Sequence, residues 1–471
     1  MAELPAKENK MGVLPVGRLI FTMSAPMVLS MLFQALYNVV DSVFVARLGQ
    51  DAMNAVSLAF PLQTVLIGVS VGTGVGMNAL VSRSLGEKHF VRADEAANTG
   101  IFLYLCSAIL FGLIGMIVPG PYYRLLTDNA RIISFGTDYI HICLGCSLAV
   151  FAQVCAERLL QSTGRTGLAM IPQMTGAILN MILDPIMIFG LFGFPRLEVA
   201  GAAVATVCGQ VVAAVIGFAL NLKKNHEIHI RIRLIRFRHG IAKEIYRIGL
   251  PSIVMQCIGS VMNFLLNTIL ISFTEAATAV FGAYFKIQSF VFLPVFGMNN
   301  ALVPVVSYNY GARKADRVRA AIRTGILSAV GVMTIGFILF ETIPDVLLGI
   351  FSPSEEMLSV GIPAFRTIGF TFPVAGFCIV AGSVCQALGK PLYSLLTSIF
   401  RQVVVLIPAA YLLSLTGRLE LVWLAFPIAE VVSLLFSAVF LRRTYRQTGI
   451  SVRRAPMPEQ TGHAEKGDQT F

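Results

Sequence analysis

Long apolar segments recur along the whole chain and are separated by short polar stretches. About 20 apolar residues are enough to cross a bilayer as a helix, so these segments predict membrane-spanning helices. The predicted spans cover residues 18–47, 53–82, 97–118, 132–160, 168–190, 199–220, 245–272, 278–307, 320–341, 357–385, 393–415 and 421–441. We therefore expect an all-α integral membrane protein with twelve transmembrane helices.

The two halves of the sequence resemble each other when they are aligned at one constant offset. Identical residues then coincide at many positions, including Pro26 with Pro251, Asn38 with Asn263, Ser82 with Ser307, Gly86 with Gly311, and Arg92 with Arg317. Each half has six predicted spans, an even number, so the halves have the same orientation in the membrane. This predicts two six-helix lobes related by a parallel internal repeat, an architecture of transporters that bind substrate between the lobes.

The repeat also predicts the domain boundaries. We expect an N-terminal lobe over residues 12–222, a basic cytoplasmic linker over 223–243, a C-terminal lobe over 244–446 and a disordered cytoplasmic tail over 447–471. The tail is predicted to be disordered because it is polar and has few residues that a folded segment could bury.

Composition and charge agree with a membrane protein. Of the 471 residues, 56% are hydrophobic and 13% are charged, whereas soluble domains have about 25% charged residues. The net charge of +11 alone would also fit a nucleic-acid-binding protein. With the N-terminus in the cytoplasm, however, 27 of the 36 Lys and Arg residues lie on the cytoplasmic side, as the positive-inside rule requires. Both termini are therefore predicted to be cytoplasmic, and no nucleic-acid partner is expected.

The sequence has no recognisable catalytic or nucleotide-binding motif. The glycines at residues 72, 74 and 76 lie inside a predicted span, which favours close helix packing over nucleotide binding. The longest loop, about 25 residues between the sixth and seventh spans, is too short for an ATPase domain. We therefore expect no enzymatic activity and no cofactor, and we expect the energy for transport to come from a gradient or from a partner subunit.

Acidic residues within spans are the main candidates for function, because a buried charge costs at least a few kcal/mol on insertion scales and is normally retained for a task. Asp41, Glu157 and Asp184 lie in N-terminal spans and align with uncharged residues in the other half. This asymmetry predicts that the N-terminal lobe binds the coupling cation.

Helix geometry refines this site. At about 1.5 Å of rise per residue, Asp41 and Asp184 each lie roughly 9 Å below the outer ends of the first and fifth spans. Asn180 lies one turn from Asp184 on the same face, and Thr206 reaches a similar depth in the sixth span. These oxygen donors suit Na⁺, whereas a carboxyl group withdrawn from water also suits H⁺. The choice between the two ions stays open, as does a packing role for Asn180 and Thr206.

Other polar residues follow helical spacing and predict the walls of a substrate cavity. These candidates are Gln34, Tyr37, Asn38, Glu157, Gln256, Asn263 and Gln288. Glu157 is near the cytoplasmic end of its span, so it is equally well interpreted as an interfacial acid or as the partner of Arg158. Pro26 shares a helix with Asp41 and is predicted to be a hinge, because proline removes a helical hydrogen bond.

Several of these motifs together resemble one transporter family. They are Ala25 and Pro26 with Asp41 in the first span, Asn180 with Leu183, Asp184 and Pro185 in the fifth, and the Gly-Ala-Ala-Val-Ala-Thr run of residues 201–206 in the sixth. They resemble the multidrug and toxic compound extrusion (MATE) family, and in particular its DinF-type branch and MepA-like relatives. The resemblance covers about residues 12–446.

The resemblance implies a multi-pass antiporter of the bacterial inner membrane that exports cationic amphipathic organic compounds in exchange for H⁺ or Na⁺ by alternating access. It implies that Asp41, Asn180, Asp184 and Thr206 hold the cation. It also favours a functional role for Glu157, because MepA-like members tend to have an acid at this place. The NorM-type branch has acids in the seventh and tenth spans, where this chain has Gln256 and an acid-free span, so we expect no cation site in the C-terminal lobe. The expected partners are organic cations and membrane lipids, and the expected functional unit is a monomer.

A second hypothesis is a flippase or exporter of a lipid-linked saccharide or another endogenous metabolite. An anionic substrate would favour several cations in the cavity, and the predicted spans offer Arg158, Lys286, Arg366 and Arg401. A membrane enzyme lacks a catalytic constellation, and a passive channel fits poorly with two repeated lobes.

Overall fold

The computed structural model of the protein describes residues 9–351 and 353–450, and within these ranges the regular elements are all helices. The first half contains α1 (Lys10–Val13), α2 (Val16–Ala46), α3 (Gln50–Gly86), α4 (Phe90–Ile117), α5 (Pro119–Leu126), α6 (Ala130–Gly145), α7 (Ser147–Ser162), α8 (Thr166–Phe189), η1 (Leu191–Gly193) and α9 (Glu198–Lys224). The second half contains η2 (Ile232–Leu234), α10 (His239–Ile271), α11 (Glu275–Gly311), α12 (Ala315–Thr342), α13 (Pro344–Gly349), α14 (Glu355–Gly369), α15 (Phe372–Ala387), α16 (Pro391–Ile399), η3 (Phe400–Leu406), α17 (Ile407–Ser414), α18 (Leu419–Val422) and α19 (Ala425–Thr448).

The predicted number of spans is confirmed for the described residues. Ten stretches of helix are long and apolar enough to cross a membrane, and two bent pairs bring the number to twelve. The pairs are α6 with α7, bent by 44°, and α14 with α15, bent by 47°. Both bends occur at equivalent places in the repeat, since the first residues of α7 and α15, Ser147 and Phe372, coincide when the halves are aligned.

The helices extend beyond the predicted spans into the predicted linker and tail. Helix α9 ends at Lys224 and α10 begins at His239, so the connection between the two halves is shorter than predicted. Helix α19 continues to Thr448, and residues 451–471 of the predicted tail lie outside the described residues.

Equivalent side chains fix equivalent helix ends and contacts in the two halves. Asn129 accepts hydrogen bonds at the start of α6 as Ser354 does at the start of α14, because these residue types satisfy the free N–H groups of a first turn. The Ser82 hydroxyl donates to the Ser162 carbonyl at 2.7 Å, and the Ser307 hydroxyl donates to the Ala387 carbonyl at 3.0 Å. The internal repeat is therefore present in the structure as well as in the sequence.

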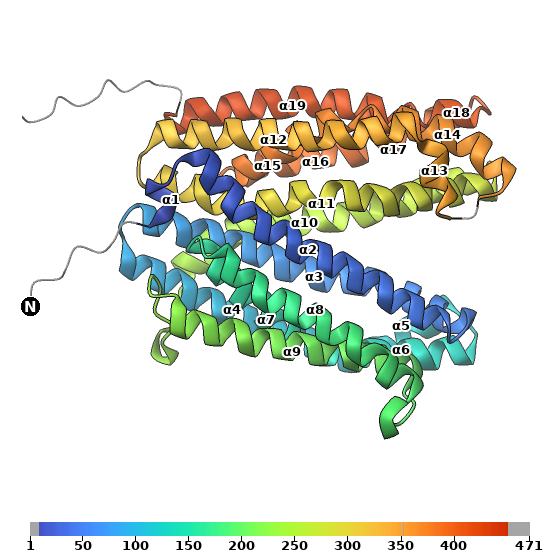
Figure 1. Ribbon diagram of the computed structural model, residues 1–471, viewed down its shortest axis with the longest axis horizontal. Helices are drawn as coiled ribbons and strands as arrows, with labels where there is room; N and C mark the ends of the chain where they lie inside the picture. Colours follow the sequence, from blue (N-terminus) through green and yellow to red (C-terminus); the bar gives the residue numbers. More distant parts are fainter. Residues whose placement is uncertain (1–8, 352, 451–471) are drawn as a thin grey trace, which may run out of the picture.

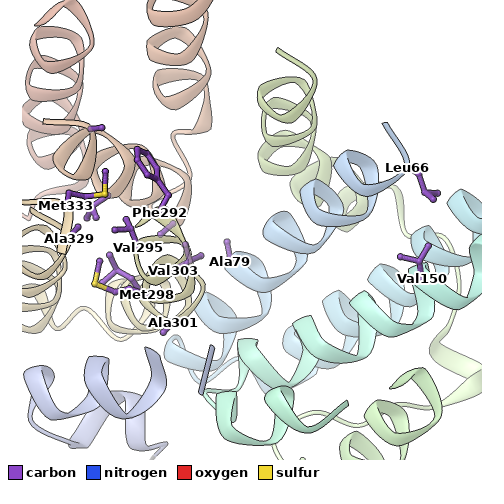
Figure 2. Close-up of a cluster of buried hydrophobic side chains, with 14 of the residues drawn as sticks. Leu66, Ala79, Val150, Phe292, Val295, Met298, Ala301, Val303, Ala329 and Met333 are labelled. Atoms are coloured by element: carbon purple, nitrogen blue, oxygen red, sulfur yellow. The ribbon is translucent and has the colours of Figure 1, made fainter. Parts of the chain in front are cut away.

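The two halves form two helical bundles that lie side by side (Figure 1). The bundles meet at the end where α1 lies and diverge toward the end that carries α5 and α13. Helices α2 and α3 of the first lobe contact α10 and α11 of the second. In the second lobe, Phe292, Val295 and Met298 of α11 lie beside Ala329 and Met333 of α12 (Figure 2), and these residues form part of a continuous buried core.

Glycines bring the lobes into backbone contact. A Cβ atom built on Gly86 of α3 would lie 2.0 Å from the Tyr308 carbonyl oxygen of α11, and one built on Gly311 would lie 2.3 Å from the Arg83 carbonyl oxygen. Gly86 is equivalent to Gly311, and Arg83 to Tyr308, when the two halves are aligned. This reciprocal contact therefore lies on the axis that relates the two lobes.

The predicted packing role of the glycine run in α3 is also confirmed. A Cβ atom on Gly72 would lie 2.9 Å from the Gly249 carbonyl oxygen of α10, and one on Gly76 would lie 2.1 Å from the Ile245 carbonyl oxygen. Only glycine allows the two backbones to approach so closely.

The short helix α1 contacts the second lobe at the end where the bundles meet. The Asn309 amide donates to the Met11 carbonyl at 2.9 Å. The Arg317 guanidinium donates to the Met11 carbonyl at 3.1 Å and to the Leu14 carbonyl at 2.6 Å. These bonds join segments that are far apart in the sequence, so they hold the start of the chain against the second lobe.

The first lobe binds the other side of α1. The Asn9 side chain caps α1, donates to the Thr163 carbonyl at 3.0 Å and also bonds the Glu227 carboxylate. Glu227 in turn lies 4.0 Å from the Arg165 guanidinium. Helix α1 is thus held by both lobes.

Candidate functional site

The candidate cation site depends on the close approach of α8 and α9. A Cβ atom on Gly176 of α8 would lie 3.0 Å from the Gly209 carbonyl oxygen of α9, and one on Gly209 would lie 2.6 Å from the Gly176 carbonyl oxygen. This contact brings Thr206 of α9 within reach of Asn180, which is one turn along α8 from Gly176.

Asn180 connects Asp184 with Thr206. With the amide oxygen toward Thr206, that oxygen accepts from the Thr206 backbone N–H at 3.2 Å and from its hydroxyl at 3.1 Å. The amide nitrogen then donates to Asp184 Oδ2 at 3.1 Å. Asp184 is fully buried and Asn180 is 2% exposed. The structure therefore places three of the four predicted cation-site residues in one hydrogen-bonded group.

Asp41 approaches this group from α2, which packs against α8. Its side chain is half-buried, and its Oδ1 atom is buried with no hydrogen-bond partner among the described residues. The Asp41 and Asp184 carboxylates are close enough to interact electrostatically. A buried carboxylate oxygen without a partner is costly, and a proton or a small cation would satisfy it.

The predicted cavity residues do not lie together in the structure. Gln34 is exposed on α2 and accepts a hydrogen bond from Gln173 of α8. Tyr37 is half-buried and Asn38 is exposed on the same helix. Pro26 lies within α2, which is one continuous helix.

The remaining cavity candidates belong to the second lobe. Gln256 is exposed and Asn263 is half-buried on α10. Gln288 of α11 lines a cavity inside that lobe. The structure therefore does not place these three residues in the Asp184 group.

Glu157 and Arg158 are both buried but bond different groups. Gln153, on the same helix, donates to the Glu157 carboxylate at 3.0 Å. Arg158 donates to the Gln161 side chain at 3.0 Å and to Asn300 of α11, in the other lobe, also at 3.0 Å. Arg158 therefore contributes to the contact between lobes, whereas Glu157 is bonded within α7.

Sequence reasoning overlooked an acid in the second lobe. Glu430 of α19 is 7% exposed and lies 3.5 Å from Arg401 of η3. Its position inside the predicted span 421–441 was sufficient to identify it, by the same rule that identified Asp41 and Asp184. Glu430 does not align with Asp41, Glu157 or Asp184, so the predicted asymmetry of those three acids is unchanged and the second lobe has an acid of its own.

Comparison with known proteins agrees with the fold. The sequence profile of the MatE family matches residues 26–186 and 251–412, one match in each half of the chain. A FAD transporter of Shewanella oneidensis is 26% identical over 419 residues, which are 88% of this chain and 92% of that protein. The multidrug export protein MepA of Staphylococcus saprophyticus is 27% identical over 402 residues, which are 85% of this chain and 88% of that protein.

A solved structure described as the outward-facing conformation of a multidrug resistance MATE transporter of the MOP superfamily superposes with a TM-score of 0.89 at 26% identity. The match covers 95% of this chain and 100% of that one. The resemblance inferred from the first, fifth and sixth spans is confirmed, as is the absence of an enzymatic role, since members of this family are transporters. The chain is a multi-pass membrane protein, and it belongs to the MatE family of transporters.

Proposed function

We propose that the protein is a secondary antiporter that exports cationic amphipathic organic compounds in exchange for H⁺ or Na⁺. The observation that carries this proposal is the buried group of Asp184, Asn180 and Thr206 next to the partnerless Asp41 oxygen. Two acids withdrawn from water within spans favour the binding of a cation. The relative named a multidrug export protein supports this class of substrate.

The mechanism follows from the arrangement of the lobes. The described conformation is closed at the end with α1, where Gly86 and Gly311 bring α3 against α11. In alternating access, the lobes rock so that this end opens and the other closes. A cation bound at Asp41 and Asp184 neutralises the two carboxylates, which removes their attraction for an organic cation and so couples the two fluxes.

The expected cellular setting completes the proposal. The transporter lies in the bacterial inner membrane with both termini in the cytoplasm, as the distribution of Lys and Arg predicts. It functions as a monomer in contact with lipid, and it needs the coupling ion but no cofactor.

Transport in proteoliposomes tests the proposal directly. We expect efflux of a cationic dye when a pH or Na⁺ gradient is imposed, and we expect Asp41→Asn and Asp184→Asn to reduce it to the level of protein-free liposomes. Asp128→Asn is the matched control, because Asp128 is exposed in the loop after α5. The proposal is wrong if neither gradient drives the dye, or if both span variants transport as well as the control.

A second candidate function is the export of an endogenous anionic metabolite, including a lipid-linked one. The observation in its favour is the relative named a FAD transporter. The same liposomes distinguish the two functions. If the protein exports anionic metabolites, an anionic substrate would be transported in liposomes that do not transport the cationic dye.

A further inference from the structure

A cavity of about 90 Å³ lies inside the second lobe, away from the candidate cation site. Its polar lining consists of Gln288, Thr371, Arg401, Gln402 and Glu430. The cavity volume is several times the volume of about 10–15 Å³ that one water molecule needs by the same measure, so the cavity has room for a small polar head group.

The repeat explains why this lobe has a cavity where the first lobe is closely packed. Gly176 and Gly209, which bring α8 against α9, are equivalent to Arg401 and Leu434 when the two halves are aligned. The close glycine contact between α8 and α9 therefore has no counterpart between the equivalent helices of the second lobe. Arg401 also lies in the π-helical segment η3, and such segments are frequent at functional sites because they widen the helix.

The carboxylate at the base of the cavity has unused binding capacity. Glu430 Oε2 lies 3.5 Å from an Arg401 nitrogen, whereas its buried Oε1 has no hydrogen-bond partner among the described residues. Tyr284 and the weakly polar thiol of Cys378 are its other titratable neighbours. The side chain of Glu430 is 10% exposed and that of Arg401 is 29% exposed, so the acid is the more deeply buried of the two.

Aromatic side chains form the apolar part of the same cavity. Phe281, Phe285, Phe292 and Phe426 line it, and Phe285 is 40% exposed. Aromatic faces attract organic cations and also pack against flat rings. The cavity therefore combines a buried acid with surfaces that suit an aromatic ligand.

We propose that this cavity is a binding subsite for the ammonium head group of an alkylamine that carries an aromatic ring, and that Arg401 pairs with Glu430 until the ligand arrives. The incoming ammonium replaces one cation by another at the same carboxylate, so the buried charge stays balanced. The contact of Arg401 with Glu430 is long, at 3.5 Å, so it is easily exchanged. The proposal rests on the proposed export of organic cations, and it adds a specific site for their head group in the second lobe.

Three dansyl compounds test the head-group preference. They are dansylcadaverine, its neutral N-acetyl derivative and the anionic dansyl-6-aminohexanoate, which share one ring system. Fluorescence titration of the purified full-length protein in lipid nanodiscs, without a gradient, should show tightest binding of the amine. Equal binding of all three compounds would show that the site binds only their apolar ring system. Tightest binding of the anion would show that Arg401, and not Glu430, binds the head group. Either result overturns the proposal.

Two substitutions give opposite predictions. Glu430→Gln should weaken binding of the amine at least about tenfold, since a charge-assisted hydrogen bond becomes a neutral one. Arg401→Gln should strengthen it severalfold by removing the competing cation, whereas Arg401→Lys should leave it near the wild-type value. Glu420→Gln is the control for removal of an acid, because Glu420 is exposed. Unchanged affinity in Glu430→Gln, or weaker affinity in a folded Arg401→Gln protein, overturns the proposal.

The outcome is separable from that of the antiport proposal. The part of amine binding that depends on Glu430 is measured by the change in affinity on Glu430→Gln, and this change should be the same whether residue 184 is Asp or Asn. If gradients fail to drive transport but the amine still requires Glu430, the antiport proposal fails and the subsite stands. If Asp184→Asn alone removes binding, the subsite proposal is wrong and the amine binds in the first lobe.

Discussion

Substitution of Gly86 by alanine would place a methyl group on the axis between the lobes. The new Cβ atom would lie 2.0 Å from the Tyr308 carbonyl oxygen, whereas ordinary van der Waals contact begins at 3.4 Å, so this oxygen must recede. The clashing atom belongs to the backbone of α11, and no side-chain rotation can relieve the overlap. Overpacking of this kind typically costs about 1–3 kcal/mol.

This cost applies to the conformation in which the α1 end is closed and is absent once α3 and α11 separate there. The equilibrium should therefore shift about 5- to 150-fold toward the state that is open at this end. Double electron–electron resonance between spin labels on Val91 of α4 and Ala320 of α12 measures the shift, because both residues are exposed near this end. The labels require a protein whose native cysteines have been replaced.

Gly331→Ala is the matched control, because Gly331 is also helical and no heavy atom lies within 4 Å of a Cβ built there. We expect longer distances in Gly86→Ala and an unchanged distribution in the control. If Gly86→Ala leaves the distances and the transport rate at their wild-type values, the glycine contact does not set the closed conformation and the reasoning fails.

Three further substitutions test other parts of the structure. Pro26→Ala should slow dye transport in liposomes while leaving cation binding intact, since the hinge is lost but Asp41 stays in place; unchanged transport would contradict the hinge hypothesis. Thr206→Val should weaken binding of the coupling ion by removing a hydroxyl that bonds Asn180; an unaltered ion dependence of transport would assign Thr206 a packing role. Burial raises the pKa of Glu227, although Asn9 and Arg165 oppose the shift. The folded state then binds the proton more tightly than the unfolded state, so melting temperature should fall as pH rises from the ordinary Glu range through the raised value, and Glu227→Gln should flatten that dependence. An equally steep pH profile in the variant would show that Glu227 does not contribute.

The fold was largely predictable because bilayer thickness imposes the length of each span. The ends of the helices were less predictable. Helix α4 begins at Phe90, for example, whereas the predicted span begins at residue 97. Hydropathy detects the apolar part of a helix and misses the turns that extend into water. The bend between α6 and α7 was not predicted either, because no proline lies within that span near Cys146.

The candidate site was predictable to the extent that it lies along helices. Helical rise placed Asp184 and Thr206 at one depth, and the structure joins them through Asn180. Arg401 pairs with Glu430 from the π-helical segment η3, and no periodicity in the sequence indicates such a segment. Contacts such as that of Asn309 with Met11 depend on how the lobes meet, and local patterns contain no information about it.

The attachment of α1 to both lobes has a consequence for how the lobes separate. Met11 and Leu14 bond side chains of the second lobe, while Asn9 bonds the first lobe. Separation of the lobes at this end would strain one short segment together with its hydrogen bonds to both lobes. Bonds that share one short segment favour opening in a single step, so partly open states should be scarce. In the antiport mechanism proposed above, a scarcity of partly open states would limit the leak of ions when no substrate is bound.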